Sequence, residues 1–275
     1  MHPVEGGFRR GTSRRLHLCD DGENVADLQP AFETMVRRLE RRAPLGAADR
    51  EALLALPHSV RRVPPGGHII RDGDKPEHCS LLLSGFAHRY KITGGGGRQI
   101  ISIHMASEFV DLQNSFLQVA DHSVQTLTEA EIATIPQAAI TELAMNRPAI
   151  GRAMWIDTLI DASIFREWVV NVGRRDSRAR VAHILCEFSL RLEAAGLARD
   201  HRYELPMTQE QLADAVGLTS VHVNRVLKQL GAEGLISRNK RSVVIEDWQR
   251  LRDVGDFNER YLHHDAAPAY AAQAR

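Results

Sequence analysis

A chain of 275 residues with 43% hydrophobic and 25% charged residues is long enough for two packed domains, and this composition excludes a disordered, collagen-like or fibrous protein. Lys and Arg together number 35, as do Asp and Glu, so the net charge neither indicates nor excludes a nucleic-acid partner. No run of about 18 apolar residues occurs, and the N-terminus lacks the apolar centre of a signal peptide. We therefore expect a cytoplasmic protein without a membrane partner.

The first part of the chain is predicted to consist of a tail followed by one or two helices. Residues 1–30 mix Gly, Arg, Asp and Glu without apolar periodicity, which is typical of a mobile tail. From residue 28 to residue 56, apolar side chains recur at helical spacings and predict one or two short helices. These side chains include Phe32, Met35, Val36, Leu39 and Leu45.

Between Val60 and Pro136 the pattern indicates many short strands. Runs such as SLLLSGFAHRYKI, QIISIHM and EIATIP are separated by the turn sequences PPGG, DGD and GGGG, which favour a β-sandwich or β-roll. The four glycines Gly94–Gly97 also suggest a phosphate-binding loop by composition. Such a loop opens a helix and is followed by Lys-Ser or Lys-Thr, whereas Arg98 begins a further strand, so we expect a hairpin turn.

A long helix is predicted from Pro148 to residue 173, with two apolar stripes. One stripe contains Trp155, Thr158, Ala162, Phe165, Val169 and Val172. The other contains Ile160, Ile164 and Trp168. A helix that is apolar on two faces needs two partners, so we expect one stripe to cover the β region and the other to meet a second copy of the chain. The alternative is a single buried helix within one domain.

After Gly173 the segment Arg174–Ser177 is a polar hinge, whose Asp176 or Ser177 can cap a further helix. That helix is predicted to end near Gly196. Its inward face contains Val181, Ile184, Leu185, Phe188 and Leu192, and we expect Cys186 to be ordinary core. With Cys19 and Cys79, the chain has too few cysteines, too widely spaced, for a disulfide framework or a four-thiolate metal site.

Residues 207–245 carry the strongest functional pattern. Thr208 and Gln211 form a capping box, the helix they begin stops at Gly217, and Thr219 caps a second helix after a very short turn. The buried stripe of this second helix contains Val223, Val226, Leu227 and Leu230. Its open face carries Ser220, Val221, Asn224, Arg225 and Lys228. The runs LISR and SVVI then predict two strands around a basic turn, so this segment is a winged helix-turn-helix.

The open face has the chemistry to recognise double-stranded DNA. The fork of Arg225 suits guanine O6 and N7, Asn224 can pair with adenine, and Val221 can touch a thymine methyl. Phosphate contacts are expected from Ser220, Lys228, Thr208 and Gln209, and in the wing from Arg238, Lys240 and Arg241. The alternative, a helical hairpin packed on a β-hairpin for structure alone, leaves the ordered series of cap, glycine stop and basic wing unexplained.

In these segments the chain resembles the cyclic-AMP receptor protein and fumarate-nitrate regulator (Crp/Fnr) family of bacterial transcription factors. GLTSVHVNRVLKQL looks like its recognition helix, LLLSGFAHRYK like a strand of its sensor, and the 148–172 helix like its dimerisation helix. The resemblance implies an α+β protein that binds a palindromic operator as a homodimer, with an effector and RNA polymerase as partners. The domains are then the tail 1–30, a β-roll sensor 31–147, a dimerisation helix 148–173, a winged helix-turn-helix 174–248 and a C-terminal tail 249–275.

The resemblance also indicates where an effector would bind. Cyclic-AMP-binding members use a Gly-Glu pair and an Arg-Ser or Arg-Thr pair, and a gapless alignment places Asp111-Leu112 and His122-Ser123 at these positions. Leu112 cannot accept a hydrogen bond from a ribose, and His122 lacks the permanent charge of arginine. Cys19 alone cannot replace an iron–sulfur ligand set, and no haem ligand is evident. We therefore expect an effector other than cyclic AMP and leave any cofactor unidentified.

Parts of the sequence also suggest three other functions. Asp121, His122 and Ser123 suggest a hydrolase triad, but neighbouring strand residues point to opposite faces. A cupin-like enzymatic or ligand-binding β-roll with an accessory DNA anchor is the main alternative, against which stands the absence of an HxH metal motif. A constitutive DNA binder that has lost its ligand is the third. We expect a regulator and not an enzyme.

Overall fold

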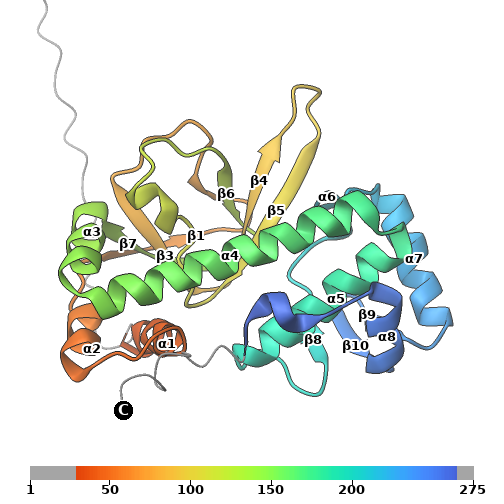
Figure 1. Ribbon diagram of the computed structural model, residues 1–275. Helices are drawn as coiled ribbons and strands as arrows, with labels where there is room; N and C mark the ends of the chain where they lie inside the picture. The colour runs from red at the N-terminus through yellow and green to blue at the C-terminus, as the bar shows by residue number, and fades with distance from the viewer. Residues whose placement is uncertain (1–28, 265–275) are drawn as a thin grey trace, which may run out of the picture.

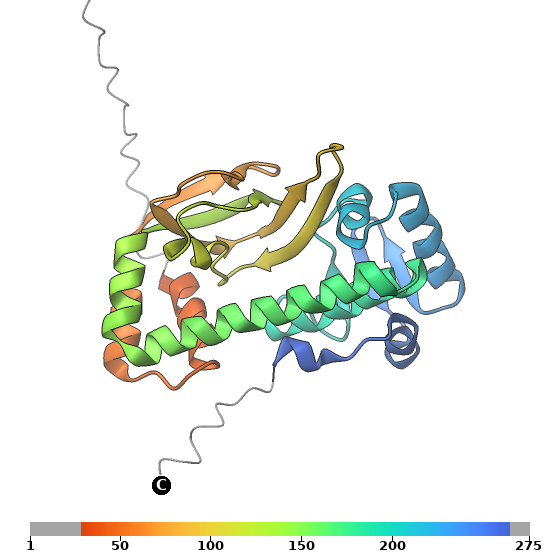
Figure 2. The ribbon, with the colours of Figure 1, turned by 45° about the horizontal axis from the view of Figure 1, so that its top comes forward.

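The structure is a computed structural model that describes residues 29–264. One long helix, α4 (Pro148–Arg174), runs across the molecule and joins an N-terminal β-rich part to a C-terminal helical part (Figures 1 and 2). The α+β class and the order of β-roll, long helix and helix-turn-helix are confirmed. The expected tail 1–30 lies outside the described residues except for its last two positions, which already belong to a helix.

Two short helices precede the sheets, as the apolar spacing predicts. Helix α1 spans Gln29–Glu40 and helix α2 spans Ala47–Leu54. The side chains of Phe32, Met35 and Leu39 are buried in a core that they share with strand β3 and with the N-terminal half of α4. Helix α1 therefore packs against both β3 and the N-terminal half of the long helix.

Seven antiparallel strands form two facing sheets, the β-roll. They are β1 (Ser59–Val63), β2 (His68–Ile70), β3 (His78–Ser84), β4 (Phe86–Ile92), β5 (Arg98–Met105), β6 (Ser123–Thr126) and β7 (Ala130–Pro136). One sheet has the order β1-β7-β3 and the other β2-β6-β4-β5. The glycines Gly94–Gly97 form the turn of the β4–β5 hairpin, with the amide of Thr93 donating to the carbonyl of Gly97. The hairpin prediction is confirmed.

Two short helical segments of the β-rich part are not evident in the sequence pattern. A 3-10 turn, η2 (Leu112–Ser115), interrupts the connection between β5 and β6, and helix α3 (Gln137–Asn146) follows β7 directly. Within α3 only Ile140 is buried, and most of the other residues are small or polar, so the apolar period is weak. Both segments, η2 and α3, therefore precede α4, which begins at Pro148.

The two stripes of α4 have different environments. Ile160 and Trp168 are buried, and the indole Nε1 of Trp168 donates to the carboxylate of Glu187 at 3.0 and 3.1 Å. In contrast, the side chains of Trp155, Phe165 and Val169 are 69%, 44% and 53% exposed. The stripe with Ile160 and Trp168 therefore covers the protein's own core, whereas residues 29–264 leave the large side chains of the other stripe exposed. Within that other stripe, Ala162 and Val172 are half-buried, and Val172 lies beside Gly217.

The C-terminal part begins with helix α5 (Ser177–Ala194), which Asp176 caps by accepting from the amides of Arg178 and Ala179. Cys186 is buried in its core, as expected. Helices α6 (Gln209–Val216) and α7 (Ser220–Ala232) follow. A small sheet of order β8-β10-β9 completes the winged helix-turn-helix with β8 (Arg202–Glu204), β9 (Ile236–Asn239) and β10 (Ser242–Ile245).

The expectation of a C-terminal tail from residue 249 is wrong for the described residues. Helix α8 (Trp248–Gly255) and the 3-10 turn η3 (Glu259–Leu262) pack against α5 and α4, and residues 265–275 lie outside the described range. Leu251, Phe257 and Leu262 are buried. Gly255 approaches so closely that a Cβ there would lie 2.8 Å from the backbone nitrogen of His183. The segment folds because its apolar residues recur at helical spacing after the Asp247 cap.

None of the helices within residues 29–264 combines the length and the apolar character that crossing a membrane requires.

Candidate nucleic-acid interface and sensor pocket

The helix-turn-helix is built by the capping interactions that the sequence predicts. The hydroxyl of Thr208 accepts from the amide of Gln211, and the Gln211 side chain accepts from the amide of Thr208. Gly217 ends α6 with a φ of 65°, a left-handed conformation that favours glycine. Thr219 then caps α7 by accepting from the amide of His222. These local bonds fix the angle between the two helices.

Most side chains on the open face of α7 are exposed. Val221 is 80% exposed, and Ser220, Arg225 and Lys228 are also exposed. Asn224 differs, because it is half-buried and its Nδ2 donates to Oε1 of Gln209 at 3.0 Å. The structure thus brings Asn224 and Gln209 together as a brace between α7 and the start of α6. Reading an adenine with Asn224 would require this hydrogen bond to be shared or exchanged.

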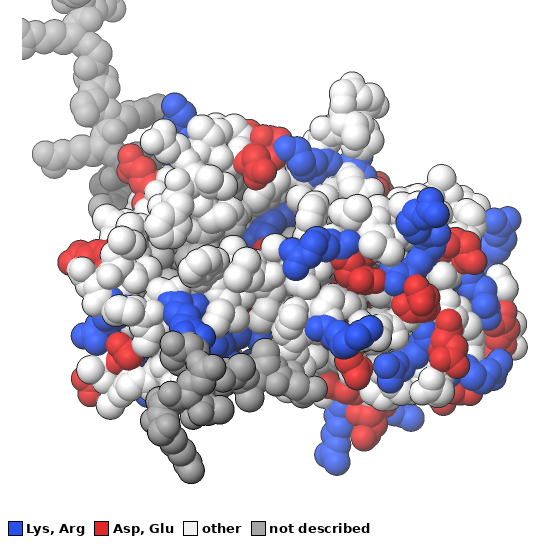
Figure 3. All heavy atoms as spheres, viewed as in Figure 1, with Lys and Arg blue, Asp and Glu red and all other residues white. Residues whose placement is uncertain are grey.

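The wing turn presents two of its three basic residues. Lys240 adopts a φ of 54° at the tip of the β9–β10 turn, and it is exposed together with Arg241. Arg238 instead is half-buried, with Nη2 donating to the carbonyl of Lys240 at 3.2 Å, and burial lowers the pKa of its guanidinium. Arg238 therefore supports the turn, and Lys240 and Arg241 are the free cations of the wing. Figure 3 shows basic side chains over this part of the molecule interspersed with acidic ones.

The β4–β5 hairpin contacts the helix-turn-helix on its other side. Nε of Arg98 lies 2.6 Å from Oδ2 of Asp214, and Nε2 of Gln99 donates to the carbonyl of Ala215 at 3.2 Å. Both partners lie on α6, so the contact leaves the open face of α7 unobstructed (Figure 2). The sensor sheet and the DNA-binding helices therefore touch directly as well as through α4.

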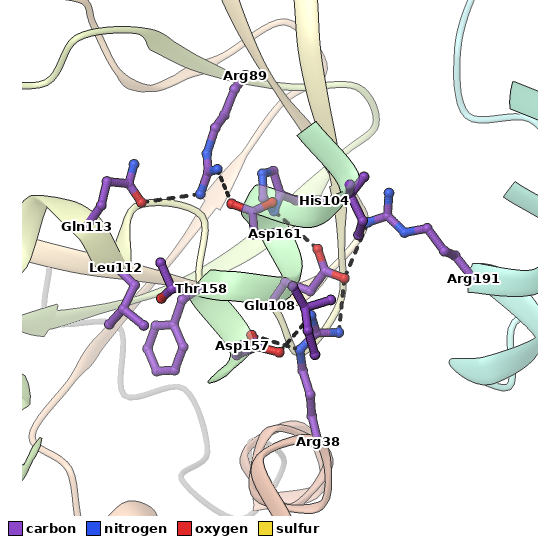
Figure 4. A pocket seen from close by; sticks show the side chains of 13 residues that line it. Arg38, Arg89, His104, Glu108, Leu112, Gln113, Asp157, Thr158, Asp161 and Arg191 are labelled. Atoms are coloured by element: carbon purple, nitrogen blue, oxygen red, sulfur yellow. Dashed lines mark hydrogen bonds and ion pairs between the residues drawn. The ribbon is translucent and has the colours of Figure 1, made fainter. Parts of the chain in front are cut away.

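The space between the β-roll and α4 is filled by ion pairs (Figure 4). Arg89 on β4 contacts the carboxylate of Asp161 on α4, donates through Nε to the carbonyl of Val110 at 3.0 Å, and approaches Oε1 of Gln113 at 3.4 Å. The cavity that remains has a volume of about 30 Å³. A volume of this size holds a water molecule or two, not a nucleotide.

Glu108, in the connection after β5, is the centre of this buried network. Its carboxylate lies 3.0 Å from Arg38 of α1, 3.5 Å from Arg191 of α5 and 3.1 Å from His104 of β5. Burial alone would raise the pKa of Glu108, but the two guanidinium groups outweigh it and hold the pKa well below its ordinary value. Arg38 also contacts Asp157 of α4 at 3.2 Å. One carboxylate thus connects α1, the β-roll and the first helix of the C-terminal part.

The residues expected at the effector site have different positions. Asp111 is fully buried and its Oδ1 accepts from the amide of Ser80 at 2.6 Å, while burial raises its pKa to about 6. Leu112 lines the small cavity. Nδ1 of His122 lies 2.6 Å from the carboxylate of Asp121, and the hydroxyl of Ser123 accepts from the amide of Asp72. These four residues therefore do not converge on one ligand.

The expectation that strand alternation separates Asp121, His122 and Ser123 is wrong for the first two residues. Asp121 and His122 lie in the loop before β6, so strand alternation does not separate them, and they do form a pair. Ser123 is nevertheless occupied by the backbone of Asp72. The residues that actually fill the sensor pocket, Arg89 and Asp161, were missed. The only signal was Arg89, a charge within the apolar strand run LLLSGFAHRYK.

A β-roll joined by a long helix to an exposed winged helix-turn-helix defines a DNA-binding protein with a sensor-like domain. Two family models agree with this class, the cyclic nucleotide-binding domain over residues 60–147 and the Crp-like helix-turn-helix domain over residues 179–254. The chain belongs to the Crp/Fnr family and is a DNA-binding transcription regulator.

Individual relatives are similar over most of their length. The transcriptional activator protein FnrL of Cereibacter sphaeroides is 27% identical over 228 residues, which cover 80% of this chain and 91% of that protein. The nitrogen fixation regulation protein FixK of Rhizobium meliloti is 26% identical over 72% of this chain and 88% of its own. The structure of FixK2 from Bradyrhizobium japonicum matches with a TM-score of 0.67 at 22% identity, covering 72% of this chain and 98% of that one. The comparisons favour the regulator over a cupin-like enzyme.

Proposed function

We propose that the protein binds an inverted-repeat operator as a homodimer formed along α4, and that its sensor does not use cyclic AMP. The observation that carries the proposal is the exposed apolar surface of α4, where Trp155, Phe165 and Val169 of the predicted stripe are exposed together with Leu159 and Val170. Large apolar side chains that recur on one face of a helix are stable in water only when a partner covers them. Figure 3 views this face, and much of its left half carries no charged side chain.

A second copy is the partner that we propose for this surface, because two-fold symmetry would also place the two recognition helices for DNA binding. An isologous dimer along α4 brings two copies of α7 to the same side of the assembly. Two recognition helices about 34 Å apart meet successive turns of one DNA groove, so the operator is an inverted repeat. The contacts proposed for DNA are those of the exposed residues Ser220, Val221, Arg225, Lys228, Lys240 and Arg241, with Thr208 and Gln209 at the start of α6.

Arg225→Ala is expected to weaken binding to the specific operator by about 1–3 kcal/mol and to relax one base preference in each half-site, because a bidentate contact to guanine is lost. The measurement is a titration of purified protein with operator and with random DNA, after the operator has been found by genome-wide footprinting. Equal losses on the two DNAs would contradict base reading by Arg225.

Lys240→Ala is the matched control for this variant. The ammonium of Lys240 is exposed on the wing and carries no base-specific fork. Its removal should weaken binding to all sequences alike and reduce the slope of affinity against salt concentration by about one ion. The pair of variants therefore separates sequence recognition from attraction to phosphate.

Cyclic AMP is expected not to bind at concentrations up to millimolar. Pockets for small molecules have volumes of about 300–1,000 Å³, whereas the space left between Arg89 and Asp161 has about 30 Å³. The ribose acceptor and the phosphate fork are also absent at Leu112 and His122, and each missing charge-assisted contact costs about 1.5–3 kcal/mol. Isothermal titration calorimetry measures this directly. Micromolar binding would show that the pocket opens and that our alignment of Leu112 and His122 is wrong.

The proposal includes action in the cytoplasm, no enzymatic role, and RNA polymerase as a further partner. It is supported by relatives such as FnrL, which is named a transcriptional activator. Transcription from the footprinted promoter with purified polymerase tests this part. A product level that does not respond to the protein would contradict it.

A further inference from the structure

A second and larger cavity adjoins the filled sensor pocket, and the two share the lining residues Arg38, Glu108, Ile160, Ile164 and Arg191. It is a groove of about 620 Å³ between α1, the turn that follows β5, α4 and the C-terminal end of α5. The end of the η3 segment forms its remaining edge, at Leu262 and His264. Its walls therefore come from both the β-rich part and the DNA-binding part of the chain. Guanidinium groups dominate its polar lining, namely those of Arg37, Arg38, Arg41, Arg42 and Arg191.

Three of these five arginines are neutralised by carboxylates. Arg38 contacts Glu108 and Asp157, and Arg42 contacts Asp157 at 3.0 Å. Arg191 lies 3.2 Å from a carboxylate oxygen of the buried Glu187 and donates to the carbonyl of Ile103 at 2.7 Å. These three guanidinium groups belong to the network that holds the fold together.

The other two arginines are not neutralised. Arg37 donates only to the hydroxyl of Thr34 at 3.0 Å, and within residues 29–264 no carboxylate forms an ion pair with Arg37 or Arg41. Arg37 lies on α1, Arg41 directly follows the last residue of that helix, Glu40, and both border the groove. Glu193, the other acid of the lining, is bound to His201 at 3.1 Å. Partial desolvation and the charges of Arg38 and Arg42 lower the pKa of Arg41, and together they outweigh the opposing effect of Asp157.

The remaining wall of the groove is apolar. Ile160 and Ile164 of α4 line it together with the small side chains of Ala194 and Ala195. A groove that contains both unmatched guanidinium groups and aliphatic side chains suits a ligand with an anionic head and an apolar body.

We propose that this groove is a binding site for an organic anion, whose phosphate or carboxylate oxygens accept from Arg37 and Arg41 and whose apolar body lies against Ile160 and Ile164. The site adjoins the sensor pocket, but Arg37 and Arg41 line only the groove, and the proposal does not depend on the operator or on the dimer. Because α1 and α5 both line the groove, a bound anion ties the DNA-binding part to the β-rich part. It thereby stabilises the arrangement of the two parts in which the groove is formed.

Calorimetric titration of the full chain with 1-naphthyl phosphate tests the proposal. The same titration with 1-naphthoate tests whether a carboxylate is preferred, and 1-naphthol is the uncharged control. We expect one site per chain for at least one of the two anions, and at least tenfold weaker binding of the neutral compound. The double variant Arg37→Gln/Arg41→Gln should lose the anion by at least tenfold, since two charge-assisted hydrogen bonds disappear. Hydrogen exchange should show that the bound anion protects the end of α1 and the end of α5 together.

The exposed Arg61 of β1 supplies the matched control, because Arg61→Gln removes the same charge away from the groove. Relief of like-charge repulsion should leave the melting temperature of the double variant unchanged or raised. If that variant fails to fold, the single variant Arg41→Gln, at an exposed position, replaces it. Unchanged anion affinity in the groove variants, an equal loss in Arg61→Gln, or equal binding of 1-naphthol would each overturn the proposal.

Discussion

Val169→Glu is expected to convert the protein from dimers to monomers and to weaken binding to the full operator by about 10²–10⁴-fold. The reason for the first effect is that Val169 is 53% exposed on the apolar face of α4, where a two-fold dimer would bury two glutamates side by side without partners. The reason for the second is that one recognition helix alone loses the effective concentration that the linked second helix provides. Sedimentation velocity and footprinting measure the two effects.

Leu197→Glu is the control for this change. Leu197 is also a large exposed aliphatic residue, but it lies beyond the end of α5 rather than on α4. The same change of charge there should leave both the dimer and the operator footprint intact. A Val169→Glu protein that stays dimeric and still protects both half-sites would show that the stripe is not the dimer interface.

Glu108→Gln is expected to lower the free energy of unfolding by about 3–5 kcal/mol at neutral pH, because it leaves Arg38 and Arg191 buried with less negative charge between them. The pH dependence has a definite sign. The carboxylate of Glu108 has a folded-state pKa well below the ordinary value of 4.5, so its stabilisation is present above that pH and is lost as the pH falls below it. The difference between the variant and the wild type should therefore shrink in acid. Denaturant titrations at pH 7 and pH 4 measure it.

Asp72→Asn is the corresponding control, because the pair of Asp72 with Lys91 is exposed and its atoms lie 3.6 Å apart. Exposed pairs contribute about 0–1 kcal/mol, so this variant should unfold almost as the wild type does. Similar losses in the two variants would mean that the network around Glu108 contributes no more than an ordinary surface pair.

The helix-turn-helix was predictable because its determinants are local. The Thr208–Gln211 capping box, the stop at Gly217 and the Thr219 cap each involve residues within four positions of one another, and all three are confirmed. Hairpin formation at Gly94–Gly97 is predictable for the same reason. A pattern that depends on neighbours in sequence can be read before the fold is known.

The filling of the sensor pocket could not be predicted in this way. Arg89 and Asp161 are 72 positions apart, and Arg38 and Glu108 are 70 apart, so nothing in the local pattern marks either pair. The gapless alignment placed Asp111 near a ligand, whereas the fold turns it inward to the amide of Ser80. Side-chain direction in an irregular loop depends on tertiary packing, which apolar periodicity does not encode.

The continuity of the core has a consequence for how the molecule unfolds. A single cluster of buried apolar side chains includes Ile103 of β5, Trp168 of α4, Leu185 of α5 and Leu251 of α8. A fragment that ended after α4 would leave Trp168 and its neighbours in water, and a fragment that began at α5 would lose the indole that Glu187 binds. We therefore expect β5, the C-terminal half of α4 and the DNA-binding part to unfold together, whereas the two other clusters of buried side chains, both in the β-rich part and the start of α4, are distinct from this one.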